Sequence, residues 1–270
     1  MQSTQKNGVL FYHSPLIPVP HGFSTRIGGV STGDQSSLNM IPNHPDTIEH
    51  VAENFRRFAS ATSCPNNSFA RNRQIHSDII HRVETALTLT DLLSPTTAHL
   101  EGDGLLTDKP QISLLAYSGD CVPILFYDKR NHIISAVHSG WRGTALGIAG
   151  KMITTMTEQF SSHPQDIVVA IGPAIRACCF SCHDDVPTAM RQTLGNQADP
   201  HITKQGEKFS VDLIGINRLW LENAGVSPQN IDSDPPCTAC NPDQFWSHRN
   251  MGNNRGSMVA IISLPEGGHP

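Results

Sequence analysis

A cysteine and a histidine near the middle of the chain are the residues whose types and spacing most plainly suggest chemistry. The polar segment 128–131 (Asp-Lys-Arg-Asn) separates the two apolar runs beside them, and this composition is typical of a turn between strands. If Lys129 and Arg130 form a two-residue hairpin loop, Cys121 lies opposite His138, with their Cβ atoms about 5 Å apart. A slip of one residue would offset the pair, so the pairing depends on the turn type.

Adjacent cysteine and histidine side chains support two kinds of chemistry. The first is a thiolate nucleophile with a histidine base. The second is a metal site, because zinc binds thiolate and imidazole well. A buried apolar cysteine beside an unrelated histidine is a third interpretation, and the pair alone does not decide among them. The segment after His138 (residues 139–144, Ser-Gly-Trp-Arg-Gly-Thr) predicts a tight turn leading into a helix, which would place Arg142 and free backbone N–H groups where phosphate could bind.

The motifs around these residues resemble those of the YfiH family. Its members are also called laccase-domain-containing or polyphenol-oxidase-like proteins, and they were later assigned as purine nucleoside phosphorylases. The resemblance covers nearly the whole chain. Its most specific motifs are Gly-Asp-Cys-Val-Pro (119–123) and Ala-Val-His-Ser-Gly-Trp-Arg-Gly-Thr (136–144). The other matching segments are 21–31, 37–39, 74–77, 102–107, 171–175, 178–180, 237–240 and 245–249.

The resemblance implies a third ligand beside Cys121 and His138. The family's zinc site also uses the histidine of a Gln-Val-His motif, which here is His76 in Gln-Ile-His. Three protein ligands leave a fourth position for water or substrate, as in catalytic zinc sites. Copper is an alternative ion, because it outcompetes zinc at many sites.

The resemblance also implies an activity. It is the zinc-dependent phosphorolysis of adenosine, inosine, guanosine and methylthioadenosine, with adenosine deamination in the same pocket. For deamination, zinc would lower the pKa of its bound water so that hydroxide attacks the purine carbon. We expect Arg26, Arg142 and Asp103 to contact substrate or phosphate, since two arginines could clamp an anion. Either Asp103 or Asp120 could orient a ligating histidine or accept a proton, and a plain turn role for each stays open.

Two positions depart from the family pattern. Ser181 stands where the family commonly has a glutamate after its Cys-Cys motif. Near the C-terminus, Gly256 and Ser257 fill the register of the family's Thr-Gly-Arg, and Arg255 is displaced from it. These departures leave the three metal ligands intact but could change substrate contacts.

The other cysteines offer a weaker metal signal. The segment Cys237–Cys240 with His248 could suggest a second site, but a structural zinc needs four ligands at suitable spacing, and these residues supply at most three. We therefore expect no second metal there, and we expect Cys178, Cys179 and Cys182 to be packing or adventitious thiols.

The elements that must position these residues follow from periodicity. Apolar spacing predicts helices over residues 46–62, from Thr144 through Phe160, and from Asp212 to Gly225. Strand-like runs are Ile79–Val83, Ile112–Tyr117, Val122–Tyr127, Ile133–His138, Ile167–Ile171 and Met258–Leu264. Strands and helices intersperse without a strict βαβ rhythm. This order predicts an α+β fold with mixed sheets flanked by helices, in one YfiH-like domain over residues 1–270.

Composition bounds the class of protein. With 270 residues the chain can bury a large core, and its formal charge of −5 argues against a nucleic-acid-binding protein. We expect no signal peptide, because the first residues lack its basic and apolar regions, and no apolar run approaches the ~18 residues of a membrane span. Seven irregularly spaced cysteines indicate reduced thiols, so we expect a cytoplasmic protein. The sequence predicts small-molecule partners and leaves the oligomeric state open.

Three other functions stay open. Cys121 and His138 could serve a cysteine hydrolase, since the family is grouped structurally with Cys/His deamidase toxins of the CNF type. A copper polyphenol oxidase fits less well, because multicopper oxidases use several His-x-His pairs and the 14 histidines form none. A non-enzymatic metal-binding module is the third.

Overall fold

The central apolar strands bury both of their faces, because they lie between two layers. The computed structural model describes residues 1–42 and 45–266. In strand β8 (Val122–Asp128), Ile124 and Phe126 pack against helices, whereas Leu125 and Tyr127 pack against a second sheet. Successive side chains of a strand point to opposite faces, so a run without polar interruption fits a strand covered on both sides.

Two six-stranded mixed sheets face each other, and a small antiparallel sheet lies beyond them. The first has the order β1 (Gln2–Lys6), β2 (Val9–His13), β3 (His21–Ser24), β15 (Met258–Ser263), β7 (Ser113–Ser118), β4 (Phe69–Ala70). The second has the order β14 (Ile231–Asp232), β10 (Ile167–Ile171), β8, β9 (Ile133–Ser139), β6 (Gly104–Thr107), β5 (Ile80–Arg82). The third has the order β11 (Ser181–Cys182), β13 (Lys208–Val211), β12 (Ile202–Gln205).

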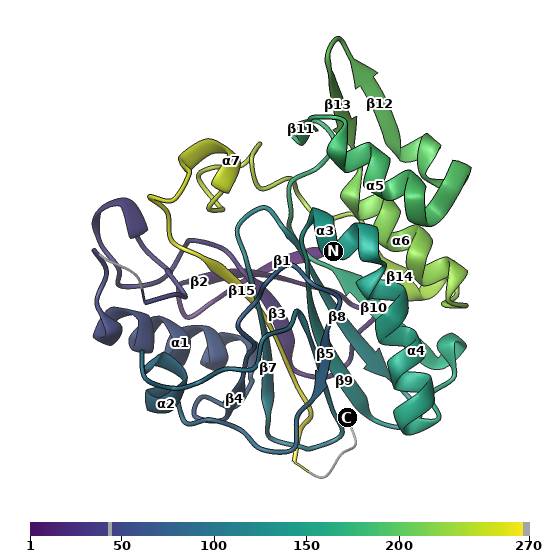
Figure 1. Ribbon diagram of the computed structural model, residues 1–270. Helices are drawn as coiled ribbons and strands as arrows, with labels where there is room; N and C mark the ends of the chain where they lie inside the picture. Colours follow the sequence, from purple (N-terminus) through teal and green to yellow (C-terminus); the bar gives the residue numbers. More distant parts are fainter. Residues whose placement is uncertain (43–44, 267–270) are drawn as a thin grey trace.

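Helices cover the two outer faces, so the two large sheets and their helices form four layers (Figure 1). Helices α1 (Ile48–Thr62) and α2 (Leu89–Leu93) pack on the first sheet. Helices α4 (Ile148–Phe160) and α6 (Leu213–Asn223) pack on the second. The remaining helices are α3 (Trp141–Leu146), α5 (Asp185–Leu194) and α7 (His248–Met251), with 3-10 turns at Gly33–Gln35, Pro164–Asp166, Gly195–His201 and Pro228–Asn230.

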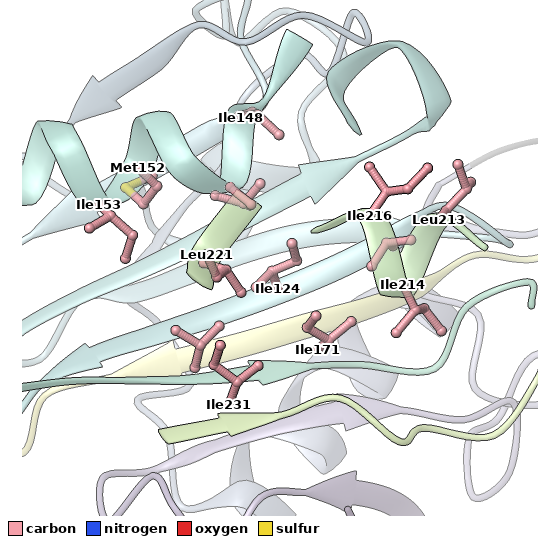
Figure 2. Packing of buried hydrophobic residues seen from close by; sticks show 14 of the residues in the cluster. Ile124, Ile148, Met152, Ile153, Ile171, Leu213, Ile214, Ile216, Leu221 and Ile231 are labelled. Atoms are coloured by element: carbon pink, nitrogen blue, oxygen red, sulfur yellow. The ribbon is translucent and has the colours of Figure 1, made fainter. Parts of the chain in front are cut away.

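The core between the second sheet and its helices anchors the strands that lead to the site. Figure 2 shows Met152 and Ile153 of α4 and Leu221 of α6 gathered over Ile124 of β8. Each of these side chains is at most 2% exposed. Burying such a side chain contributes roughly 1.5–3 kcal/mol. Packing against α4 and α6 therefore holds β8 and β9, whose ends carry the site, in place.

The hairpin register differs from the predicted one. Asp128 pairs with Ile133, so the loop holds residues 129–132, and His138 pairs with Pro123 rather than with Cys121. The shift is two residues, and because the side-chain period is also two, the facing side is preserved. Cys121 lies just before β8, at the same end of the hairpin as His138.

Local hydrogen bonds explain the longer loop. The Oδ1 atom of Asp128 accepts the backbone N–H groups of Arg130 at 2.8 Å and Asn131 at 3.1 Å. His132 then adopts a left-handed conformation with φ +53°. The aspartate side chain thus stabilises a four-residue turn that a count from its two basic residues misses.

The long helix predicted from Thr144 to Phe160 is two helices. Gly147 has φ +77° and separates α3 from α4. The ring of Trp220 fills the space beside it, 3.1 Å from where a Cβ would lie, and its Nε1 donates to the Thr144 carbonyl at 2.8 Å. The break therefore serves packing against α6.

The other predicted elements match the structure within one or two residues. The first helix begins at Ile48 rather than Asp46, with Thr47 as its cap, and Asp212 caps α6 by accepting the Gly215 N–H. All six predicted strands are present. The α+β fold class with mixed sheets is confirmed. Of the helices in the part of the chain that is described, none has the length and apolar character to cross a membrane.

Candidate functional site

Three side chains from distant parts of the chain meet at one end of the second sheet. His76 comes from the loop between β4 and β5, Cys121 from the turn before β8, and His138 from the end of β9. Their ligand atoms all lie within 4.8 Å of one another. The two imidazole rings are 4.9 Å apart between centroids and inclined at 76°. The structure thus brings the three residues proposed as metal ligands together.

Asp103 connects two of these ligands. Its Oδ1 lies 2.8 Å from Nδ1 of His138 and accepts the His76 backbone N–H at 3.1 Å. Its Oδ2 accepts the backbone N–H of Ser77 at 2.6 Å and the Ser77 hydroxyl at 2.7 Å. Burial raises the pKa of this carboxyl group, but hydrogen bonds from His138 and Ser77 outweigh it and lower the pKa to about 2. The ionised carboxylate fixes Nδ1 of His138 as a donor and leaves Nε2 for a ligand.

The pKa values of His138 and His76 shift in opposite directions. Burial lowers the pKa of His138, but the charge of Cys121 and the hydrogen bond to Asp103 outweigh it and raise the pKa to about 9. Desolvation lowers the pKa of His76, and the positive charges of His138 and Arg142 lower it further. Without a metal ion, His138 is therefore the protonated ring of the pair and His76 is the neutral one. A metal ion binds both rings in their neutral form and would displace that proton.

The donor set and the space around it fit a metal ion. Two imidazoles and one thiolate with an open position are a combination found in catalytic zinc sites. At Gly140 a Cβ atom would lie 2.3 Å from Nδ1 of His76 and 3.4 Å from the Cys121 sulfur. The glycine therefore keeps room for both ligands.

Strained backbone flanks the site. His76 has φ +61° and Asp120 has φ +91°. Such conformations cost about 1–3 kcal/mol each and persist where surrounding contacts hold them. The Asp120 carboxylate accepts the Thr238 hydroxyl at 2.5 Å, the Ser247 hydroxyl at 2.9 Å and the Arg249 N–H at 2.7 Å. Asp120 thus joins the turn before Cys121 to two C-terminal segments, and it is Asp103 that contacts a proposed metal ligand.

A pocket of about 460 Å³ opens beside the three ligands. Its volume falls in the range of small-molecule sites, roughly 300–1,000 Å³. Apolar and aromatic side chains and two arginines share its walls. The lining residues are Gln74, His76, Tyr117, Ser118, Gly119, Asp120, Cys121, His138, Trp141, Ile175, Phe180, Leu213, His248, Arg249, Asn253, Arg255 and Ser257.

Arg255 is part of this wall although the sequence comparison suggested that it is displaced. Its guanidinium packs on Gly119, where a Cβ would lie 2.2 Å from Nη1, and Nη1 donates to the Gly256 carbonyl at 2.8 Å. Burial lowers the pKa of Arg255, whereas the charges of Asp120 and Cys121 raise it. A half-buried cation therefore lies beside the proposed metal ligands, although the family register suggested that it is displaced.

The two arginines that the sequence analysis proposed to contact substrate or phosphate, Arg26 and Arg142, lie outside the pocket lining. The guanidinium of Arg26 donates to the Ser36 carbonyl at 3.2 and 2.9 Å and to the Pro242 carbonyl at 3.0 Å. Arg142 stacks over the Trp141 ring, with its guanidinium carbon 4.3 Å from the centroid. Arg26 thus joins two loops, and Arg142 stacks on a residue that lines the pocket.

Gln74 is a positioning residue that the spacing analysis missed. Its Nε2 donates to the Tyr117 carbonyl at 2.9 Å, and its Oε1 accepts the Tyr117 N–H at 2.7 Å. This pair of bonds fastens the loop that carries His76 to strand β7. The Gln-x-His motif is the signal that could have revealed it.

The structure brings four of the remaining cysteines together, a cluster that the sequence analysis did not predict. The thiols of Cys178, Cys179, Cys237 and Cys240 gather with all sulfur atoms within 4.8 Å of one another. Cys178 and Cys179, adjacent on a turn, lie beside Cys237 and Cys240. Cys182 lies outside this cluster, against the Phe209 carbonyl at 3.4 Å.

The fold and the site together define a class of mixed α+β proteins in which a His-Cys-His set opens into a pocket. Residues 20–265 match the family described as multi-copper polyphenol oxidoreductase laccase, and the chain belongs to this family. The resemblance to the YfiH family drawn from the motifs is thereby confirmed.

Named relatives cover most of the chain. It is 35% identical to purine nucleoside phosphorylase YlmD of Geobacillus stearothermophilus, over 93% of this chain and 92% of that protein. It is 31% identical to a purine nucleoside phosphorylase of Mus musculus over 97% of this chain, and it spans 60% of that longer relative. The crystal structure of the hypothetical protein YfiH of Bacillus licheniformis superposes with a TM-score of 0.89 at 32% identity, covering 96% of this chain and 97% of the other.

Proposed function

We propose that this chain is a zinc-dependent purine nucleoside phosphorylase whose ion is held by His76, Cys121 and His138. The observation that carries the proposal is the His-Cys-His set in the wall of a nucleoside-sized pocket. The names of the bacterial and mouse relatives support the reaction class. Adenosine, inosine, guanosine and methylthioadenosine are the proposed substrates, and the unpaired state of all seven cysteines fits a cytoplasmic enzyme.

The arginines of the pocket wall, Arg249 and Arg255, bind phosphate in this proposal. Arg249 and Arg255 line the pocket and supply positive charge in a partly desolvated space, where an anion is held more strongly than in water. Arg142, which stacks on Trp141, adds positive potential at His76. This assignment moves the main phosphate contacts from Arg26 to residues near the C-terminus.

The nucleoside is held by the apolar part of the wall. Trp141, Phe180, Ile175 and Leu213 offer surface for a purine ring. In phosphorolysis a phosphate oxygen forms a bond to the anomeric carbon of the ribose as the bond to the purine nitrogen breaks. The electron pair leaves with the purine, which takes up a proton, and ribose 1-phosphate is the other product. Holding both reactants in one pocket contributes through proximity and orientation.

The residues around the ligands keep this geometry fixed. Asp103 orients His138 and the backbone of His76, and Gln74 fastens the loop to β7. When bound, zinc supplies Lewis-acid chemistry at the pocket wall. The same pocket is proposed to deaminate adenosine, in which water replaces the exocyclic amino group and ammonia leaves.

The test is a product assay with purified protein, inosine and phosphate. Hypoxanthine and ribose 1-phosphate should form together, and neither should form when phosphate is omitted. Hypoxanthine with free ribose in phosphate-free buffer would indicate a hydrolase and would contradict phosphorolysis. No consumption of any of the four nucleosides would favour the Cys121–His138 hydrolase or the binding module. Oxidation of a phenol only after copper loading would favour the oxidase.

A further inference from the structure

Four thiols outside the proposed active centre meet where two loops cross. Cys178 and Cys179 lie on the turn after β10, and Cys237 and Cys240 lie on the loop between β14 and α7. All four sulfur atoms lie within 4.8 Å of one another. The sulfur of Cys240 is 3.5 Å from that of Cys178 and 3.3 Å from that of Cys179.

These spacings fit a shared metal ion better than a disulfide. In a tetrahedral zinc site with Zn–S bonds of about 2.3 Å, neighbouring sulfurs lie about 3.8 Å apart. A disulfide requires about 2.05 Å between two sulfurs. The observed separations of 3.3 and 3.5 Å, within an overall limit of 4.8 Å, lie slightly below the first value and well above the second.

The surroundings also suit thiolate ligands. The backbone N–H of Arg176 points at the Cys237 sulfur at 3.4 Å, a contact that favours negative charge on sulfur. Nη1 of Arg249 donates to the Cys179 carbonyl at 3.1 Å, which places a cation beside the cluster. The guanidinium of Arg176 is paired with the Asp234 carboxylate at 2.9 Å.

We propose that Cys178, Cys179, Cys237 and Cys240 form a structural metal site for zinc, separate from the His-Cys-His centre. Four thiolates complete a tetrahedral shell, so this site has no open position for substrate. Each thiol releases its proton to solvent as its sulfur binds the ion, and no electron transfer is involved. The proposal does not depend on phosphorolysis.

The site would fasten one wall of the pocket. Phe180 follows Cys179 and lines the pocket, and Thr238 follows Cys237 and donates to Asp120 at 2.5 Å. Backbone pairing already links the loops, because the Thr238 N–H donates to the Ala174 carbonyl at 3.0 Å. An ion across the thiols would lock this arrangement and help to hold the strained Asp120 turn.

Metal analysis of the full-length protein tests the proposal. Protein refolded or exchanged in zinc alone should carry two equivalents. Cys240→Ser should carry one equivalent, whereas Cys182→Ser, a nearby thiol outside the cluster, should keep two. Equal zinc content in wild type and in a folded Cys240→Ser variant would overturn the proposal. So would a count of fewer than seven free thiols in denatured, metal-stripped protein kept without reductant, since that result indicates a disulfide.

A second measurement covers the case in which Cys240→Ser does not fold. His76→Ala removes a ligand of the other centre and should leave one zinc ion at the thiol cluster. X-ray absorption at the zinc edge of that variant should show four sulfur neighbours at about 2.3 Å. A shell containing nitrogen or oxygen, or no bound zinc, would contradict the four-thiolate site.

Discussion

Nδ1 of His138 lies 2.8 Å from Oδ1 of Asp103, and the same oxygen accepts the backbone N–H of His76 at 3.1 Å. One buried carboxylate therefore orients a ligand side chain from one strand and the backbone of a ligand from a separate loop. This arrangement makes the relative position of two proposed metal ligands depend on a single side chain.

Replacing this carboxylate should weaken the metal centre without removing a ligand. In Asp103→Asn the side chain loses its negative charge. Its amide nitrogen cannot accept the N–H donors that the carboxylate oxygen accepts. We expect a loss of about 10–100-fold in zinc affinity at this centre and in phosphorolysis. Competition with a chelator, beside the surface control Asp108→Asn, measures it. An unchanged affinity in a folded Asp103→Asn protein would show that the carboxylate is not a support for the centre.

A methyl group at Gly140 should also damage the centre. Its Cβ would lie 2.3 Å from Nδ1 of His76, too close for the ring to keep its place. Gly140→Ala should reduce zinc affinity at this centre about tenfold or more. Gly206→Ala is the control for a general loss of stability, because φ +62° strains an alanine there while its Cβ meets open space. Zinc binding by Gly140→Ala equal to that of the control would argue against His76 as a ligand in the observed position.

Sequence periodicity predicted the platform of the site better than the site itself. Apolar runs predict strand β8, which begins after Cys121, and strand β9, which contains His138 near its end. The predicted register was wrong by two residues, and this error left both residues on the same face. His76 lies in a loop with no period, so only the motif resemblance placed it. The thiol cluster joins residues up to 62 positions apart, and no local pattern encodes that proximity. Arg255 reaches the pocket through packing on Gly119, which a register count cannot show.

Chelation should change the reactivity of Cys121. A bound ion occupies its sulfur, so alkylation should be slow in zinc-loaded protein and fast after the ion is removed. Peptide mass spectrometry separates this thiol from exposed Cys178 and Cys240. Cys64 is buried away from the site and serves as the unreactive reference. Equal alkylation of Cys121 in the two states would indicate that it is not a ligand.

The buried ring of His21 should make stability depend on pH. Its Nε2 accepts the Ser14 N–H at 3.0 Å, so Nδ1 carries the proton and donates to the Val19 carbonyl at 2.8 Å. Burial lowers the pKa of His21 from 6.5 to about 4. Between these values the unfolded chain binds a proton that the folded chain does not, so the free energy of unfolding falls as pH falls through this window.

The expected size of this effect is about 2–3 kcal/mol between pH 7 and pH 4.5, following from the shift in pKa. Urea unfolding of wild type and of His21→Gln at both pH values isolates it. The variant is expected to be less stable at pH 7 but to lose less on acidification. Parallel losses in the two proteins would mean that the ring is protonated in the folded state.

The most direct test of the metal-centred account is His76→Ala, because it removes one ligand and leaves Cys121 and His138 in place. Zinc content and phosphate-dependent cleavage of inosine are measured on the same preparation, with exposed His163→Ala as the control. The account predicts one zinc equivalent fewer than wild type and a loss of phosphorolysis by orders of magnitude, since an incomplete site loses affinity steeply. Phosphorolysis by His76→Ala at a near wild-type rate would contradict it.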